Sequence, residues 1–332
     1  MSPETKIYDI YGFIIAVEGP ANNYFQKEFG RLESSRGRVK DIHLYVRPTD
    51  KEGLPTRSAG SLKGLYIPFA ESENILWYNP RESFYVLLSY CEALLRWDDK
   101  VFLHAGCVSR NNNAFLFIGS GNVGKTSIVM NLLNKGYEYL SDDWLIIGNG
   151  KAYPFPKTIH IFDYNLRNKQ VAKRVLGSKR IFYFLLFKLL RLGEKSAPHR
   201  FLRFAFQSLT PRFDIDIQTL YPDAKIGGIS SISKVFYLER WARDDIEVEE
   251  RIDVEQIARR MAYVNLYERN YFFKEYARYA YEYNVRNYQI ENQSKHDFEV
   301  IYNTLKRVPL VKVLIPQKAD FATGDVSFLQ IG

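Results

Sequence analysis

The stretch Ala-Phe-Leu-Phe-Ile-Gly-Ser-Gly-Asn-Val-Gly-Lys-Thr, residues 114–126, decides the class of fold. A short apolar run ends in a glycine-rich turn, and a helical pattern follows over Ser127–Leu133. A strand, loop and helix in this order point several backbone N–H groups at one anion, and the helix N-terminus adds partial positive charge. A turn that binds no ligand is the alternative, but this combination of residues is uncommon by chance. The stretch therefore predicts a nucleoside triphosphate site.

The residues of this loop have separate expected tasks. Lys125 reaches the β- and γ-phosphates, and the hydroxyl of Thr126 is offered to Mg²⁺. ATP and Mg²⁺ are therefore the expected ligands. The residues expected to bind the nucleotide are Gly119, Ser120, Gly121, Asn122, Val123, Gly124, Lys125, Thr126 and Ser127.

Composition narrows the class of protein. The chain has 332 residues, a formal net charge of +8 and only two cysteines, Cys91 and Cys107. This cysteine count argues against a disulfide framework and favours a cytoplasmic location. Neither a signal peptide nor the ~18 uninterrupted apolar residues of a membrane span can be recognised. Positive charge favours anionic partners, among them ATP and acidic peptides. A homo-oligomer is possible on these data.

Residues 1–80 predict a small β-rich N-terminal module. Short apolar runs alternate with turn signals there, as is typical of strands. Polar stretches at 33–38 and 48–63 are expected to be loops. The expected strands are Ile7–Val17, Ile42–Val46 and Gly64–Phe69, and Asn74–Tyr78 is a possible fourth.

Residues 81–332 predict the domain that contains the phosphate loop. A helical period runs from Glu82 to Arg96, and further helices are expected at Val254–Tyr263 and Phe272–Tyr283. A hairpin turn is expected at Asn111–Asn113, before the strand that leads into the loop, and a second turn at Gly148–Gly150. The expected strands are Val101–Val108, Ala114–Ile118, Trp144–Ile147, Ala152–Phe155, Ser233–Leu238 and Val311–Ile315.

Residues 179–208 combine basic residues with bulky apolar ones. A helix that lies on a membrane surface has this composition. A lid or substrate-recognition element that packs on the domain, extending over 179–212, has it as well. Both interpretations stay open at this stage.

Two adjacent carboxylates, Asp142 and Asp143, follow the loop after a helix-length interval. Phosphoryl transfer needs a phosphate cradle, a metal and a group that deprotonates or orients the acceptor. Neighbouring carboxylates on an extended chain point to different sides, so one can accept the proton while the other holds Mg²⁺. A solvated turn is the alternative. His104 lies on the strand before the loop, where a histidine is more often a core residue.

Three segments together resemble the HPr kinase/phosphorylase family: Leu-His-Ala-Gly-Cys-Val at 103–108, the phosphate loop, and Leu-Ser-Asp-Asp at 140–143. The chain is more similar to divergent relatives than to the HPr-specific enzymes. The resemblance implies an α/β P-loop kinase domain of the HPr kinase and phosphoenolpyruvate carboxykinase-like type with a mixed sheet. It also implies that Asp142 is the general base on a serine hydroxyl, that Asp143 assists the metal, and that His104 and Lys125 belong to the catalytic site.

The chain also departs from that family. The Glu-x-Arg-Gly-Leu-Gly segment of those enzymes is absent, and its nearest match, Lys-Ile-Gly-Gly at 225–228, lacks the acid and the arginine. We therefore expect neither phosphate removal nor HPr as the substrate.

The expected function is an ATP-dependent kinase that phosphorylates a hydroxyl, most simply that of a serine. The acceptor is a small protein, a precursor peptide or free serine. The alternative is an ATP-binding or ATP-hydrolysing regulatory protein without a phosphorylated substrate. Nucleic acid is not an expected partner, because only the basic charge favours it.

Overall fold

The computed structural model describes residues 4–34, 42–49, 59–62, 65–68, 74–80, 87–162, 165–196, 213–284, 286–317, 319, 321 and 326–331. Contacts within the chain divide it into two compact units. The first unit comprises Met1–His104, Ile146–Tyr153 and Asp253–Pro309, and the second comprises Ala105–Leu145, Pro154–Ile252 and Leu310–Gly332. Both units combine helices with sheets, so the chain has a mixed α/β fold. The expected domain boundary between residues 80 and 81 stays a prediction.

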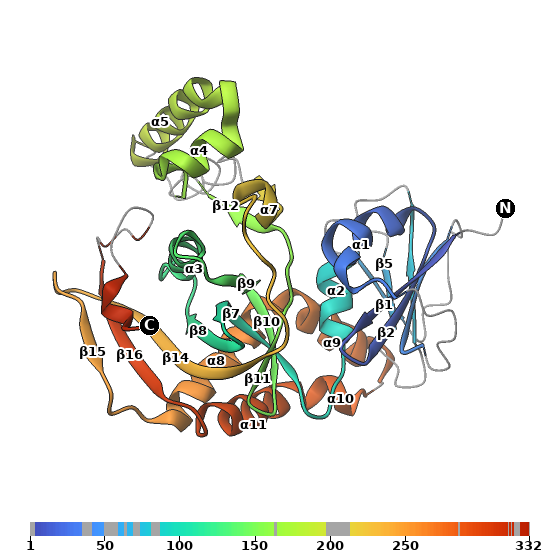
Figure 1. The fold of residues 1–332 in the computed structure, drawn as a ribbon. Helices are drawn as coiled ribbons and strands as arrows, with labels where there is room; N and C mark the ends of the chain where they lie inside the picture. The colour runs from blue at the N-terminus through green and yellow to red at the C-terminus, as the bar shows by residue number, and fades with distance from the viewer. Residues whose placement is uncertain are drawn as a thin grey trace. The chain divides into compact units, whose positions relative to one another are not determined.

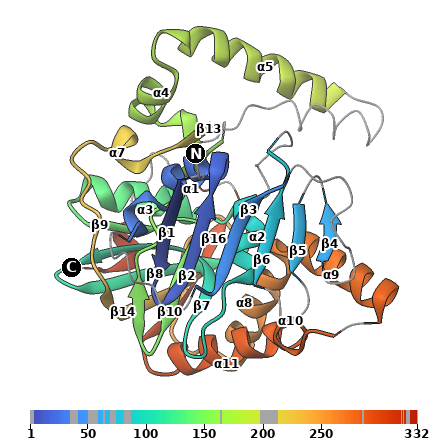
Figure 2. The same cartoon turned by 90° about the vertical axis from the view of Figure 1, so that its right-hand side faces the viewer.

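The first unit contains a sheet whose described strands follow the order β1-β2-β3-β6-β5-β4 (Figure 2). The β2–β3 and β3–β6 pairs are parallel, and the other pairs are antiparallel. Three of the predicted strands are confirmed as β3, β5 and β6. The strands are β1 (Thr5–Ile10), β2 (Phe13–Glu18), β3 (Leu44–Pro48), β4 (Ala59–Leu62), β5 (Leu65–Pro68) and β6 (Ile75–Tyr78).

Three expectations for this region need correction. The run Ile7–Val17 is interrupted by a turn at Tyr11 and Gly12, both with positive φ, where Asp9 accepts a hydrogen bond from the Gly12 N–H. The stretch 48–63, expected to be a loop, contains β4. Helix α1 (Asn22–Phe29) was not expected, although Phe25 and Phe29 recur at helical spacing and are both buried.

In the first unit, the helices predicted at Val254–Tyr263 and Phe272–Tyr283 are confirmed. Some other helices of this unit were not predicted. Residues 82–86 of the helix predicted over Glu82–Arg96 lie outside the described residues, and α2 covers the part from Leu87 to Leu94. The segments α10 and α11 were not predicted. The helices are α2 (Leu87–Leu94), α8 (Val254–Glu268), α9 (Asn270–Tyr283), α10 (Tyr288–Glu291) and α11 (Gln293–Leu305); the hairpin strands β10 (Trp144–Gly148) and β11 (Lys151–Tyr153) turn at Asn149 and Gly150.

A buried polar network between α8 and α11 explains why the helical pattern of α11 is weak in the sequence. Asn265 of α8 donates from Nδ2 to Asp297 Oδ2 of α11 at 2.9 Å, and to the carbonyl of Phe102 at 2.6 Å. Arg269 lies 3.7 Å from the same carboxylate. Polar residues therefore occupy core positions where a periodic pattern would show apolar ones.

The second unit is built on a mixed sheet with the described order β9-β7-β8-β14-β16-β15. The β8–β14 and β14–β16 pairs are parallel, and the β7–β8, β7–β9 and β15–β16 pairs are antiparallel. A short second sheet pairs β12 with β13. The strands are β7 (Val101–Arg110), β8 (Asn113–Gly119), β9 (Glu138–Ser141), β12 (Ile159–Ile161), β13 (Phe213–Ile215), β14 (Ser230–Trp241), β15 (Glu247–Glu249) and β16 (Leu310–Pro316).

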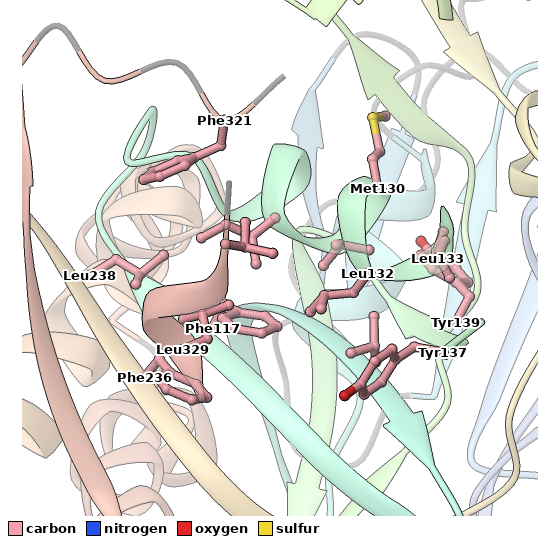
Figure 3. Packing of buried hydrophobic residues seen from close by; sticks show 14 of the residues in the cluster. Phe117, Met130, Leu132, Leu133, Tyr137, Tyr139, Phe236, Leu238, Phe321 and Leu329 are labelled. Carbon is pink, nitrogen blue, oxygen red and sulfur yellow. The ribbon is translucent and has the colours of Figure 1, made fainter. Parts of the chain in front are cut away.

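Helix α3 is the next element after β8, from which the phosphate loop separates it, and it packs on this sheet (Figure 1). The rings of Phe117 and Phe236 stack at 5.4 Å beneath it, and Leu132 of α3 joins the same cluster (Figure 3). This packing holds the end of β8 and the start of α3 in a defined relation. The helices of this unit are α3 (Lys125–Asn134), α4 (Lys169–Leu176), α5 (Arg180–Ser196) and α7 (Ile217–Leu220), with 3₁₀ turns at Asn165–Arg167, Gly177–Lys179 and Ser327–Leu329. The first unit has 3₁₀ turns at Gly19–Ala21 and Gly30–Leu32.

Helix α5 accounts for part of the basic and apolar stretch 179–208, and residues 197–212 lie outside the described residues. Within the described part of the chain, no helix combines the length and the hydropathy that crossing a bilayer requires.

Candidate functional site

The loop between β8 and α3 has the backbone conformation that its glycines predict. Gly119 has a φ of 147° and lies so close to β14 that an added Cβ would overlap the carbonyl oxygen of Leu238. Gly124 has a φ of 105°, and a Cβ there would lie 2.8 Å from the Phe321 ring. Both positions therefore require glycine. The loop is tight where it leaves the strand and again where it enters the helix.

Helix α3 begins at Lys125 with Gly124 as its N-cap. Gly124 has no side chain that could accept a hydrogen bond from the first turn. The first N–H groups of a helix lack intrahelical acceptors and carry the positive end of the helix dipole. The helix therefore presents donors and partial positive charge where the loop would hold phosphate oxygens.

The ammonium group of Lys125 lies on its own loop. Its Nζ donates to the carbonyl of Gly119 at 3.0 Å and to that of Ser120 at 2.8 Å, and the side chain is buried. A full positive charge is thus concentrated at the centre of the loop. The expected contact between Lys125 and the phosphates of a nucleotide stays a prediction.

Thr126 and Asp142 meet although they lie on different elements. The hydroxyl of Thr126 is 2.9 Å from Oδ2 and 3.1 Å from Oδ1 of Asp142, to which it donates. Asp142 follows β9 and is buried. Burial, and secondarily the charge of Asp143, raise the pKa of the Asp142 carboxyl to about 7, against the opposing effects of the Thr126 hydrogen bond and Lys125.

Asp143 faces a different group. Its backbone is left-handed, with a φ of 66°, a conformation uncommon for residues other than glycine and asparagine. Its carbonyl oxygen accepts a hydrogen bond from the Ala105 N–H at 3.0 Å, which helps to hold this turn. Its Oδ2 lies 3.9 Å from Nε2 of His160. The two adjacent carboxylates therefore point in different directions, as expected.

His160 connects Asp143 to a third carboxylate. His160 is the central residue of β12 and pairs in register with Asp214 of β13. Its Nδ1 lies 2.6 Å from Oδ1 of Asp214. Asp214, His160 and Asp143, in this order, form an acid–histidine–acid row. A histidine held on one ring nitrogen has a defined orientation of the other nitrogen.

Arg240 adds a second positive charge beside the loop. It lies at the carboxyl end of β14, two residues beyond Leu238, which pairs in register with Gly119. Its Nη1 donates to the carbonyl of Pro316 at 2.6 Å and to that of Ala319 at 3.1 Å. Its Nη2 is 4.0 Å from the position of a Cβ at Gly124. Arg240 is therefore fixed next to the start of α3.

Within the second unit, the predicted site residues Lys125, Thr126 and Asp142 lie close together. The predicted site residue His104 belongs to the first unit. His104 is a buried residue of β7, and its backbone N–H donates to Oδ1 of Asn265 at 3.3 Å. A catalytic role for His104 stays a prediction. Ser127, in the first turn of α3, is buried.

Three charged or titratable residues near the loop were not predicted as site residues: His160, Asp214 and Arg240. The alternation Ile-His-Ile at 159–161 and Phe-Asp-Ile at 213–215 is a signal for short strands with the polar residue outward. Their pairing with each other leaves no trace in the sequence. Arg240 could have been found as a cation at the carboxyl end of a strand that runs parallel to β8.

No protein-family model matches this chain, and no curated protein matches its sequence.

Proposed function

We propose that this chain is an ATP-dependent kinase that transfers the γ-phosphoryl group to a hydroxyl, with a domain of the HPr kinase-like P-loop type. The observation that carries the proposal is the hydrogen-bonded pair of Thr126 and Asp142 directly behind the glycine loop. In P-loop nucleoside triphosphatases the metal is held by the loop serine or threonine and by an aspartate elsewhere in the domain. The same pair of chemical groups meets here.

The triphosphate site is made by the loop and by α3. Backbone N–H groups at the start of α3 would bind the phosphate oxygens, and Lys125 would exchange its contacts with the loop carbonyls for contacts with the β- and γ-phosphates. Arg240 would add charge on the side of β14. Since the γ-phosphoryl oxygens carry the charge of the transition state, these cations favour transfer and not binding alone.

Thr126 and Asp142 fit a magnesium ion. Both offer oxygen ligands, and Mg²⁺ in such sites is held by one or two carboxylates together with substrate phosphates. The bound ion would neutralise charge on the β- and γ-phosphate oxygens. It would also lower the pKa that burial has raised in Asp142, because a nearby cation favours the ionised carboxylate.

Asp143 is then the residue left to act as general base. Its side chain is about one-third exposed, whereas Asp142 is buried, so an acceptor can approach Asp143 more readily. In the reaction the acceptor oxygen forms a bond to the γ-phosphorus, the bond from that phosphorus to the β–γ bridging oxygen breaks, and ADP leaves. The hydroxyl proton passes to Asp143. This assignment exchanges the roles that the family resemblance implies for Asp142 and Asp143.

The acid–histidine–acid row would orient the base. With Nδ1 held by Asp214, the His160 Nε2 is directed towards Asp143. His160 is therefore a positioning residue in this proposal. The acceptor is a serine hydroxyl in a small protein, in a precursor peptide or in free serine.

The test is transfer of label from [γ-³²P]ATP to free serine and, separately, to the proteins and peptides of a cell extract. We expect an acid-stable phosphorylated product with the wild type and labelling lowered by roughly 10²-fold or more with Asp143→Asn. The matched control is Asp244→Asn, which changes an exposed carboxylate three residues after the end of β14. This variant should behave as wild type.

A regulatory protein that only binds or hydrolyses ATP would give a different pattern. It would release inorganic phosphate at the same rate with and without acceptors, and no acceptor would become labelled. That result would contradict the kinase proposal while leaving the nucleotide site in place.

A further inference from the structure

Helix α5 exposes a set of bulky apolar side chains. Ile181, Phe182, Phe184, Leu185, Leu189 and Leu192 are between 53% and 75% exposed. Isolated exposed apolar residues are normal on proteins, but a group of this size on one helix is not. The group falls in the basic stretch for which the sequence left two interpretations open.

These side chains form a continuous face. An α-helix turns by about 100° per residue, so Ile181, Leu185, Leu189 and Leu192 fall within about 80° of one another. Phe182 and Phe184 flank this stripe on its two sides. Over its twelve residues the stripe extends for roughly 18 Å at about 1.5 Å per residue.

The opposite face of α5 accounts for the packing of the helix on its own unit. Tyr183 contacts the ring of Phe213 of β13 at 5.3 Å and that of Phe187 at 6.2 Å, and Phe187 is buried. The helix therefore has one apolar face for its own domain and a second that no described residue covers. A lid closed on the domain would bury that second face.

The charge around this face has one sign. Residues 165–193 contain eight Lys and Arg residues and no Asp or Glu. Lys169 and Lys173 of α4, and Lys179 and Lys188 next to or within the stripe, are all exposed. Long basic side chains can keep their ammonium groups in a polar layer while their stems follow apolar surface.

We propose that α5 binds the surface of a lipid bilayer that contains anionic headgroups, with the stripe Ile181–Leu192 inserted among the acyl chains. A helix with a bulky apolar face and a basic surround, too short and too charged to span, is the type that lies in the interface plane. The stripe is a convex ridge, which suits a deformable lipid interface. An acidic protein partner would need a matching apolar groove.

Binding of the full-length protein to vesicles tests this inference. Vesicles of phosphatidylcholine alone are compared with vesicles of phosphatidylcholine and phosphatidylglycerol, and bound protein is measured by co-sedimentation. We expect binding to the anionic vesicles that falls with added salt, and weak binding to the neutral ones.

Two sets of variants separate the apolar and the basic contributions. Leu185→Ser with Leu189→Ser should weaken binding to anionic vesicles by about tenfold or more, because two inserted side chains are lost. The matched control, Ile229→Ser with Val248→Ser, changes two exposed aliphatic residues elsewhere in the same unit and should bind as wild type. Lys179→Glu with Lys188→Glu should weaken binding to anionic vesicles only. Circular dichroism checks that each variant is folded.

Either of two results would overturn the inference. The first is a wild type that fails to bind anionic vesicles at low salt. The second is vesicle binding that the Leu185 and Leu189 changes leave unaltered. If the wild type does not bind vesicles but forms oligomers that the same leucine changes dissolve, the face is a protein interface instead. The measurement does not depend on kinase activity, so it can fail or succeed separately from the proposed function.

Discussion

The hydroxyl of Thr126 donates to both carboxylate oxygens of Asp142, at 2.9 and 3.1 Å, although sixteen residues separate them in the chain. Thr126 lies in the first turn of α3 and Asp142 follows β9, so helix and sheet meet at this contact. The two neighbouring carboxylates therefore face different groups: Asp142 faces Thr126 of the phosphate loop, and Asp143 faces His160. The predictions below follow from that division.

Asparagine at each carboxylate should separate the two proposed roles. Asp143→Asn should keep Mg²⁺-dependent binding of ATP and lose roughly 10²- to 10⁴-fold in transfer, the usual effect of removing a general base. Asp142→Asn should weaken the dependence of ATP affinity on Mg²⁺, because a ligand of the ion is lost. Titration with a fluorescent ATP analogue at several Mg²⁺ concentrations measures the Mg²⁺ dependence of ATP affinity. Formation of the phosphorylated product measures transfer.

The opposite pattern would restore the roles that the family resemblance implies. Asp143→Asn would then lose the Mg²⁺ dependence, and Asp142→Asn would keep it while losing transfer. Asp244→Asn serves as the control in both assays.

The stability of the nucleotide-free protein should depend on pH through Asp142. Its pKa is raised from about 3.8 to about 7 in the folded protein, so the folded state holds this proton more tightly than the unfolded state. The stabilisation is complete below pH 4 and is lost as the pH rises through 7. Relative to Asp142→Asn, the wild type should lose about 2–3 kcal/mol of unfolding free energy between pH 5 and pH 8.

Urea unfolding in the presence of a chelator, at several pH values, checks this dependence. Asp244→Asn should follow the wild-type curve throughout. Parallel curves for the wild type and Asp142→Asn would show that Asp142 does not titrate in this range.

Two glycines of the phosphate loop provide a matched pair. Gly119→Ala should destabilise the protein by about 1–3 kcal/mol and weaken ATP binding, because the residue has a φ of 147° and its Cβ would overlap β14. Gly121→Ala places its methyl group in open space and should change the unfolding free energy by less than about 1 kcal/mol. Thermal unfolding compares the two variants, and equal losses of stability would contradict the close approach of Gly119 to Leu238.

Removal of the His160 imidazole should affect the chemical step more than ATP binding. We expect His160→Gln to lower kcat by about tenfold with little change in KM for ATP, because the side chain orients Asp143 and touches no phosphate. Asp214→Asn should lower kcat in the same direction by a smaller factor, since it acts through His160. Steady-state kinetics measures both values.

A purely structural role for His160 would give another result. The His160 and Asp214 variants would then lose unfolding free energy while kcat per folded molecule stayed at the wild-type value.

The order of elements around the loop could be predicted because local rules govern it. The apolar run 114–118, the glycines and the period of the following helix are all short-range signals. They locate β8 and α3 to within two residues. The same rules failed for α11, where Asp297 occupies a core position and pairs with Asn265 of α8. Only a partner distant in sequence makes a buried carboxylate tolerable there.

Local sequence patterns were enough to predict the phosphate loop and the adjacent carboxylate pair, because glycine conformation and residue spacing act over a few neighbouring residues. Three relations follow only from the folded chain: Asp142 meets Thr126, Asp143 meets His160, and Arg240 lies beside Gly124. Those relations depend on strand register and on the left-handed turn at Asp143. Both arise from the packing of segments far apart in the chain, and no local pattern encodes that packing.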